Sequence, residues 1–219
     1  MELWKKLIDL SDEIARIFDD NFEQYPIQED INFPGWKDTY WKSEHVRKCH
    51  LKTIDNRETQ KLWLMHINIF PKTNLSAPIL GFDIVAGQNK ITGSFFDYSP
   101  VDKHQFMDYY YTRVKDLSWN KPRELPEWAQ SIFSENMIAA GNIRTEEEVN
   151  QLSEVCIDLI KYYVENLGQY EAIGDYKENQ NYYCKQQKLN PHLHKSILAM
   201  GINEKDKNRY VNNVLFEEV

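Results

Sequence analysis

Cysteine, positive charge and long hydrophobic runs are all scarce in this sequence. The three cysteines, Cys49, Cys156 and Cys184, lie far apart and include no Cys-x-x-Cys pair. Neither a disulfide framework nor a zinc or iron–sulfur site is therefore indicated. No segment approaches the roughly 20 apolar residues of a membrane span. The N-terminal stretch MELWKKLIDLSDEIARIF has acidic residues among its apolar positions, unlike a signal peptide. We expect a soluble, cytoplasmic protein that does not bind membranes.

The excess of acidic residues limits the classes of partner. The formal net charge is -8 at pH 7, which argues against general nucleic-acid binding without excluding local basic patches. The 219 residues contain no repeat, no low-complexity segment and no Gly/Ser linker. With 42% hydrophobic and 13% aromatic side chains, they can bury one sizeable core. We therefore predict a single domain over residues 1–219.

The order of the apolar patterns predicts a sheet between helices. Residues 3–17 carry leucine and isoleucine at spacings of three and four, typical of a helix with one buried face. Helical patterns return after Pro100. Between them lie four segments rich in β-branched and aromatic residues, whose short connections favour an antiparallel meander: residues 44–54, 61–70, 78–87 and 90–99. We predict an α+β fold with helices packed on an antiparallel sheet.

The helices of the C-terminal part have recognisable ends. Residues 145–168 begin with a Thr-x-x-Glu capping box and end at a glycine. Residues 189–201 offer Asn190 as N-cap, ahead of a proline, and also end at a glycine. Residues 203–216 are predicted as the last helix.

Polar side chains interrupt the predicted strands on one face. Because alternate strand residues share a face, Asp83 lies on the side of Gly81 and Val85. His66 lies on a mixed face of the preceding strand, and His50 alternates with lysines in the strand before that. Gly81 leaves room for a bulky group to approach the sheet. This combination indicates the floor of a pocket for a flat, partly polar ligand, with Gly81 and Val85 among its contacts.

Other interpretations of these residues stay open at this point. A buried histidine is more often a hydrogen-bonded core residue than a catalyst. Asp83 is the stronger candidate, because an unpaired buried carboxylate is costly and aspartate is depleted in strands. Two histidines and Asp83 could form a facial triad for iron, but the close His-x-Asp pair of such sites is missing, and we predict no metal. A small hydrolase or dehydratase with His66 as base and Asp83 as acid is a further alternative.

A series of separated motifs resembles one known family. The motifs agree in order and rough spacing, and the similarity extends from about residue 27 to the C-terminus. They closely resemble the ferredoxin-dependent bilin reductases, nearest to the phycocyanobilin:ferredoxin oxidoreductase branch: RKCHLK, MHINIFP, APILGFDIVAG, FFDYSP, RELPEWAQSIFS, YYCKQQ and NNVLF.

The resemblance implies a three-layer α/β/α sandwich that holds biliverdin IXα between its antiparallel sheet and its C-terminal helices. It implies reduction by electrons from reduced ferredoxin, with no bound flavin, metal or nicotinamide, so that the substrate itself becomes the radical. Carried over by motif, the proton-donating aspartate is Asp83, its partner is His66, and a second histidine is His50. Beside the bilin, Asp83 is expected to be buried with a raised pKa. Thr92 matches a position near a propionate, and an ordinary strand residue is an equal interpretation.

Two departures from the family pattern bear on the product. Where phycocyanobilin-forming relatives have a glutamic acid that protonates the D-ring vinyl group, this chain has Lys52, a weaker acid whose length lets it reach the rim or contact a propionate of the substrate. Asn190 stands where some phycoerythrobilin-forming relatives have a second catalytic aspartate, although its N-cap role explains it as well. We predict four-electron reduction of biliverdin IXα to phycoerythrobilin through 15,16-dihydrobiliverdin, as in the phage-type group. Phycocyanobilin formation and a non-catalytic bilin carrier are the alternatives.

A small basic cluster is the predicted docking site for ferredoxin, which is acidic. Lys185, Lys188 and Lys195 lie close together in the sequence, and Arg47 and Lys48 are expected near the same pocket mouth. A solvated helix face is the alternative interpretation. The protein is expected to act as a monomer.

Overall fold

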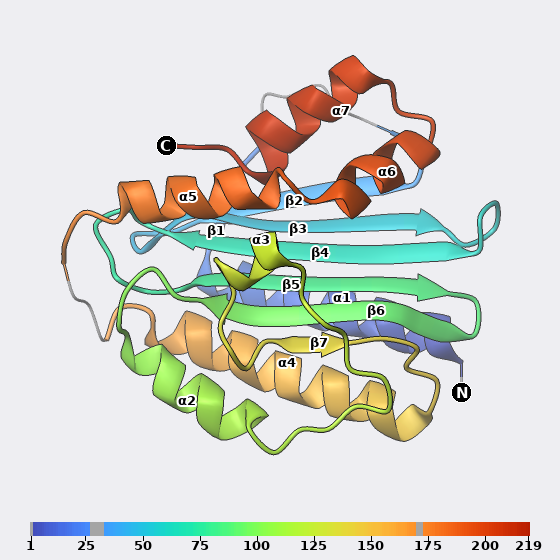
Figure 1. Ribbon diagram of the computed structural model, residues 1–219, viewed down its shortest axis with the longest axis horizontal. Helices are drawn as coiled ribbons and strands as arrows, with labels where there is room; N and C mark the ends of the chain where they lie inside the picture. Colours follow the sequence, from blue (N-terminus) through green and yellow to red (C-terminus); the bar gives the residue numbers. More distant parts are fainter. Residues whose placement is uncertain (1, 27–32, 170–172) are drawn as a thin grey trace.

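A computed structural model describes residues 2–26, 33–169 and 173–219, and Figure 1 shows its ribbon. At its centre is a seven-stranded sheet in which all neighbouring strands are antiparallel and the strand order follows the chain. The strands are β1 (Glu23–Gln24), β2 (Trp36–Lys42), β3 (Val46–Asn56), β4 (Leu62–Pro71), β5 (Ile79–Gly87), β6 (Lys90–Ser99) and β7 (Ile138–Ala140). The predicted meander is confirmed as β3 to β6, and β1, β2 and β7 extend it.

One face of the sheet packs against three helices, α1 (Leu3–Asn21), α2 (Gln105–Val114) and α4 (Glu146–Asn166). Their buried side chains form one hydrophobic core with strand residues that point the same way, such as Met65 and Phe82. The apolar stripe predicted for the first helix lies in this core: Leu3, Leu7, Leu10, Ile14 and Ile17.

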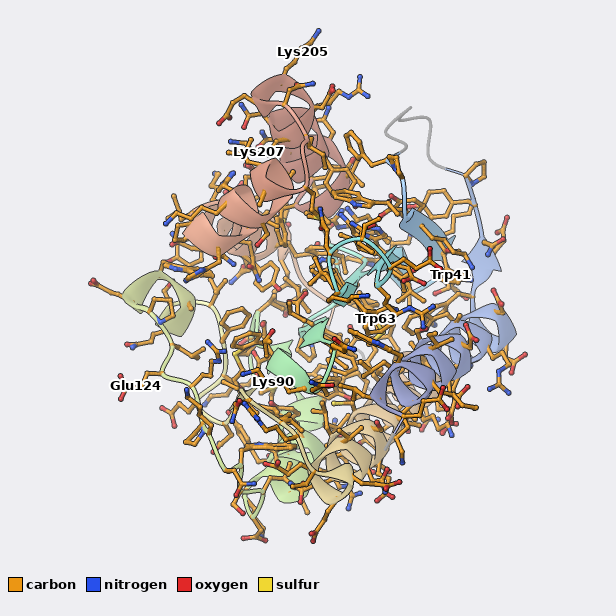
Figure 2. All side chains as sticks on the ribbon, turned by 90° about the vertical axis from the view of Figure 1, so that its right-hand side faces the viewer. Trp41, Trp63, Lys90, Glu124, Lys205 and Lys207 are labelled. Carbon is orange, nitrogen blue, oxygen red and sulfur yellow. The ribbon has the colours of Figure 1, made fainter. Side chains whose placement is uncertain are left out.

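The C-terminal helices pack on the opposite face. They are α5 (Lys177–Gln187), α6 (Pro191–Ala199), α7 (Glu204–Tyr210) and the π-helical turn η1 (Val211–Leu215), with the short α3 (Glu127–Gln130) nearby. A second hydrophobic core lies here and includes Phe70, Ile79 and Val214. Figure 2 shows the two groups of helices on either side of the sheet, so the predicted α/β/α sandwich of the α+β class is confirmed. In the described part of the chain, no helix is long and apolar enough to cross a membrane.

The helix ends follow the capping residues. Thr145 caps α4 by accepting a hydrogen bond from a first-turn backbone N–H at 3.2 Å, and Asn190 caps α6 in the same way at 3.0 Å. Gly201 follows α6 with a φ of +86°, a conformation that favours glycine. The predicted last helix differs, because α7 continues as the wider turn η1, where the Phe216 N–H donates to the Val211 carbonyl at 3.0 Å. This turn keeps the apolar end of the helix packed on the sheet.

Candidate functional site

The register of the sheet brings the predicted polar residues onto one face. His66 on β4 lies directly opposite Lys52 on β3 and Asp83 on β5. Directly opposite residues of antiparallel strands point to the same side. Two adjacent rows of facing residues therefore cross the sheet beneath the C-terminal helices: Asp38, Lys52, His66, Asp83 and Phe95, and beside them Tyr40, His50, Asn68, Gly81 and Asp97.

Asp83 and His66 form a hydrogen-bonded pair. Asp83 Oδ1 lies 2.6 Å from His66 Nδ1, and Asn68 Nδ2 lies 2.8 Å from the other ring nitrogen, Nε2. With the Asn68 amide donating to Nε2, neutral His66 carries its proton on Nδ1 and donates it to Asp83. The Asp83 side chain is 44% exposed. This strand position opens onto a cavity, and burial of the carboxylate beside a bound bilin stays a prediction.

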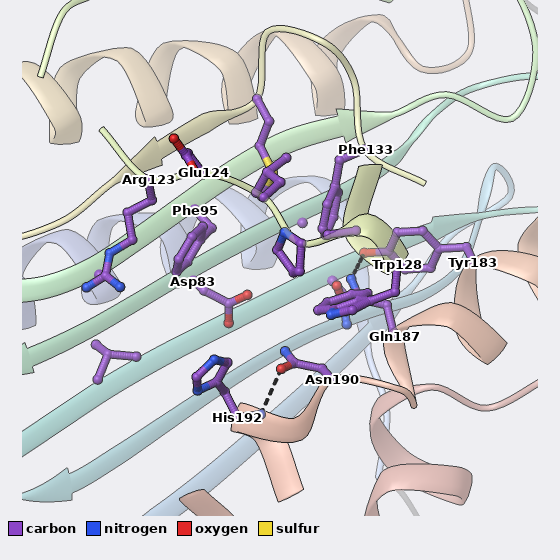
Figure 3. A pocket seen from close by; sticks show the side chains of 18 of the residues that line it. Asp83, Phe95, Arg123, Glu124, Trp128, Phe133, Tyr183, Gln187, Asn190 and His192 are labelled. Atoms are coloured by element: carbon purple, nitrogen blue, oxygen red, sulfur yellow. Dashed lines mark hydrogen bonds between the residues drawn. The ribbon is translucent and has the colours of Figure 1, made fainter. Parts of the chain in front are cut away.

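The cavity has a volume of about 640 Å³ and lies over β5 and β6, closed by the segment around α3 and the start of α6. Figure 3 shows the Asp83 carboxylate pointing into it. His50, His66 and Lys52 do not line it, and Phe216 covers His66 with its ring centroid 6.1 Å away. The other predicted site residues on the sheet and on α6 do line it: Gly81, Val85, Thr92 and Asn190.

Aromatic side chains form much of the cavity wall. Figure 3 shows Phe95, Trp128, Phe133 and Tyr183 around the space. A Cβ on Gly81 would lie 3.4 Å from the Tyr183 hydroxyl oxygen, so the group for which this glycine leaves room is a tyrosine of α5. None of the four rings was predicted as a site residue, although the RELPEWAQSIFS and YYCKQQ motifs contain three of them. Flat rings of this kind suit a flat conjugated ligand.

The edge of the cavity is held by backbone contacts. The Thr92 hydroxyl donates to the Val85 carbonyl at 2.9 Å, and the Arg123 guanidinium donates to the Thr92 carbonyl. The Thr92 hydroxyl is thus already hydrogen-bonded within the sheet. Arg123, the cation beside it on the cavity wall, was not predicted as a site residue.

A second carboxylate–histidine pair lies beside the first. His50 Nε2 is 2.6 Å from Asp38 Oδ1, and the Tyr210 hydroxyl donates to the same oxygen at 2.6 Å. Burial lowers the pKa of His50 to about 4, so its ring is neutral near pH 7 and donates from Nε2 to Asp38. Burial favours the protonated form of Asp38, but the contacts with His50, Lys52 and Tyr210 outweigh it and lower its pKa. His50 was predicted, whereas Asp38 and Tyr210 were not.

Lys52 is enclosed within the protein. Its Nζ lies 3.1 Å from the ring centroid of Trp36 and 4.0 Å from that of Tyr210. Burial lowers its pKa to about 7, while Asp38 and Asp83 favour the charged form. The expectation that Lys52 reaches the rim is therefore wrong, because two aromatic faces hold the ammonium inside.

A third carboxylate, Asp97, is fully buried in the second row. It accepts hydrogen bonds from the Ser99 hydroxyl at 2.9 Å, from the Ser134 N–H at 2.9 Å and from the Ser134 hydroxyl. Burial raises its pKa to about 6, although these hydrogen bonds act in the opposite direction. Asp97 thus ties β6 to the segment after α3 that supplies the cavity wall. Within the described ranges, no group of three or more His, Cys, Asp and Glu side chains is placed to hold a metal ion.

One known family matches most of the chain. The family described as ferredoxin-dependent bilin reductase matches residues 19–217. The chain belongs to this family. It is an enzyme, an oxidoreductase of the ferredoxin-dependent bilin reductases, as the sequence motifs predicted.

Relatives of this bilin reductase include enzymes named phycocyanobilin:ferredoxin oxidoreductase. The one from Synechococcus sp. is 28% identical over 187 residues, with 81% of this chain and 73% of the relative covered. The one from Prochlorococcus marinus is 29% identical over 184 residues, with 80% and 73% covered. The solved structure of PcyX has a TM-score of 0.72 at 24% identity and covers 97% of this chain and 99% of its own. Phytochromobilin synthase from tomato, in complex with biliverdin, has a TM-score of 0.69 at 15% identity, with 97% and 82% covered.

The lysines predicted to dock ferredoxin lie on α5, on α6 and between them. Lys188 and Lys185 approach the same carboxylate, that of Glu218, at 2.7 and 3.6 Å, and Lys195 is exposed on α6. Lys48 is 2% exposed, and its Nζ donates to a backbone carbonyl of η1 at 2.5 Å. The expectation that Lys48 joins the basic rim of this bilin reductase is therefore wrong, because β3 directs it beneath the last helix.

Proposed function

We propose that this bilin reductase converts biliverdin IXα into phycoerythrobilin through 15,16-dihydrobiliverdin, with four electrons from reduced ferredoxin. The observation that carries the proposal is the Asp83–His66 pair on a cavity walled by flat aromatic side chains. Biliverdin is a flat conjugated tetrapyrrole whose polar edge carries pyrrole N–H groups and lactam oxygens. Within such a cavity these groups can contact the Asp83 carboxyl.

Asp83 delivers protons in this proposal. Each electron added to the bilin builds negative charge, which a proton must neutralise at the reacting carbon, so each two-electron reduction takes up two protons. Asp83 donates from the carboxyl group that faces the cavity. Protonated His66 then restores this proton along the 2.6 Å hydrogen bond, while Asn68 turns its carbonyl oxygen towards the remaining N–H of the ring. His50 is neutral and hydrogen-bonded to Asp38, and it holds the sheet in place beside this pair.

The product follows from the residue opposite His66 on β3. By the resemblance above, phycocyanobilin-forming relatives have at this position a glutamic acid that protonates the D-ring vinyl group. Here Lys52 is enclosed by aromatic rings and is not part of the cavity surface. A pKa of about 7 does not itself prevent proton donation, whereas the enclosed position does. The vinyl group is therefore retained, and the two reductions occur at the methine bridge between the C- and D-rings and at the A-ring.

Phycocyanobilin is the second candidate product, because the curated relatives from Synechococcus sp. and Prochlorococcus marinus bear its name. A carrier that holds the pigment without reducing it is a candidate of another class. It would use the same cavity and would need neither Asp83 nor ferredoxin.

One experiment separates these functions. The purified protein is incubated with biliverdin IXα, ferredoxin and its reductase while the visible spectrum is recorded, and the released bilins are chromatographed against standards. We expect a spectral change only with reduced ferredoxin, and phycoerythrobilin as the product. Phycocyanobilin, with its D-ring ethyl group, would overturn the inference from Lys52. Accumulation of 15,16-dihydrobiliverdin alone would mean that the second reduction lacks its donor, and bound but unchanged bilin would make the protein a carrier.

A further inference from the structure

Lys48 joins the sheet to the end of the C-terminal helices. It stands on the same face of β3 as His50 and Lys52, and it is 2% exposed. Its Nζ donates to the Val214 carbonyl at 2.5 Å and to the Leu215 carbonyl at 3.4 Å. The last carbonyls of a helix have no partner within that helix, and a cation is favourable beside them. Lys48 therefore holds the end of η1, and this contact connects the RKCHLK motif with the NNVLF motif.

The ammonium of this lysine is mostly charged near pH 7. Burial lowers the pKa of Lys48 to about 8, while the Glu217 carboxylate, 3.9 Å from Nζ, favours the charged form. A buried charge is costly unless it is paired and hydrogen-bonded. The carbonyls of η1 and the Glu217 carboxylate supply these partners, so the turn and the lysine are fixed relative to each other.

Phe216, the residue that follows η1, lies against His66. The two ring centroids are 6.1 Å apart and the ring planes are inclined by 85°, so the edge of one ring meets the face of the other. Phe216 is 2% exposed, and the side chain of His66 is 12% exposed. The turn that Lys48 holds therefore places an apolar ring on the histidine that is hydrogen-bonded to Asp83.

We propose that Lys48 is a positioning residue for proton transfer: by holding η1 it keeps Phe216 on the His66 ring, and so keeps that ring hydrogen-bonded to Asp83 instead of to water. The inference rests on the proposed function, in which His66 passes a proton to Asp83. A hydrogen bond is stronger where water is excluded. Neither Lys48 nor Phe216 lines the cavity, so both act on the pair and not on the substrate.

The first test measures the exposure of the His66 ring and does not use the reaction. In D2O the hydrogen on Cε1 of a histidine ring exchanges slowly, and mass spectrometry of the peptides follows it. We expect this exchange at His66 to be about fivefold faster in Lys48→Met and in Phe216→Leu than in the parent. Lys207→Met should match the parent, because Lys207 is also nearly buried but contacts Glu204 on its own helix. His50, which is 0% exposed, should stay slow in every protein unless packing is lost generally.

The second test measures binding and turnover in the same proteins. We expect Lys48→Met and Phe216→Leu to keep the parental affinity for biliverdin and to lose turnover about tenfold. Because Lys48 acts through Phe216, the loss in the double variant should be smaller than the product of the two single losses. Phe216→Leu leaves the buried charge in place, so it tests the cover on His66 even if Lys48→Met does not fold.

The outcomes separate this inference from the proposed function. Parental exchange at His66 in Phe216→Leu contradicts the inference, whatever the activity of the parent. Faster exchange with parental turnover also contradicts it, and so does a double variant whose loss equals the product of the single losses. A parent that binds biliverdin and leaves it unchanged contradicts the proposed function, and with it the role of Lys48 in proton transfer.

Discussion

Asp83 stands in a strand interior, where aspartate is rare, and its hydrogen bond to His66 explains how the strand accommodates it. Replacing Asp83 by asparagine keeps the shape but removes the transferable proton. We expect Asp83→Asn to bind biliverdin and to lose turnover by about 10²–10⁴, measured from the spectral change with reduced ferredoxin. Asp20→Asn, the same change at an exposed position of α1, should behave like the parent. Parental turnover in Asp83→Asn would refute its role as proton donor.

The role of His66 can be tested separately from that of Asp83. Glutamine at position 66 can still hydrogen-bond to Asp83, but it cannot carry a proton to it. We therefore expect turnover to fall less in His66→Gln than in Asp83→Asn. The pH dependence that arises from reprotonation of Asp83 by His66 should be absent from His66→Gln. The measurement is turnover as a function of pH for the parent and for His66→Gln. Superimposable profiles would show that no proton passes between the two residues.

Asp97 makes the stability of the fold depend on pH. Between the usual carboxyl pKa of 3.8 and the raised value of about 6, the folded protein holds this proton while the unfolded chain releases it. The contribution of Asp97 to the free energy of unfolding therefore falls as the pH rises through this range. From pH 4 to pH 7 we expect the stability of the parent relative to Asp97→Asn to fall by about 2 kcal/mol. Denaturant unfolding at the two pH values measures this, and Asp20→Asn, whose carboxyl is exposed, should show no such change.

At the residue scale, the sequence predicts those site residues whose type is unusual for the segment in which they lie. Asp83 is a carboxylate within an apolar strand, and the motif around it is distinctive. Asp38 was not found in this way, because its hydrogen bonds to His50, 12 residues along the chain, and to Tyr210, 172 residues along, form only in the folded protein. Arg123 begins the RELPEWAQSIFS motif, but only the fold shows that its guanidinium contacts the Thr92 carbonyl on β6.

At the scale of elements, α6 begins beside the cavity, and Asn190 both caps it and lines the cavity. If capping is its whole role, serine should replace it, because a hydroxyl also accepts from the first-turn N–H. We expect Asn190→Ser to keep the parental product and the slow amide hydrogen exchange of α6. Asn190→Ala should lose about 1 kcal/mol of helix stability and exchange faster. A changed product in Asn190→Ser would instead place Asn190 in the second reduction.

The long elements were predictable because their patterns repeat along many residues. The strands β3 to β6 have nine or more residues each and are rich in β-branched and aromatic side chains, and α4 and α6 carry side-chain caps. β7 has three residues and β1 has two, too few for any period to emerge. The change from α7 to η1 was not predictable either, because it depends on tertiary burial of the helix end and not on local propensity.

At the scale of the whole molecule, a net charge of -8 opposes binding of an acidic ferredoxin, while the lysines around α5 and α6 favour it locally. The two effects predict opposite responses to salt. Screening of repulsion between the whole proteins would speed electron transfer, and screening of a local attraction would slow it. The fold favours the local effect, because Lys195 is exposed on α6, the helix that begins at the cavity.

We therefore expect kcat/KM for ferredoxin to fall as the ionic strength rises. Lys195→Gln should lower it about threefold at low salt. Lys115→Gln, on the opposite helical layer, gives the same net charge and should have little effect. Glu218→Gln should raise kcat/KM, because it removes the carboxylate that Lys185 and Lys188 approach. A rate that rises with salt, or equal effects of Lys195→Gln and Lys115→Gln, would mean that ferredoxin docks elsewhere on the surface.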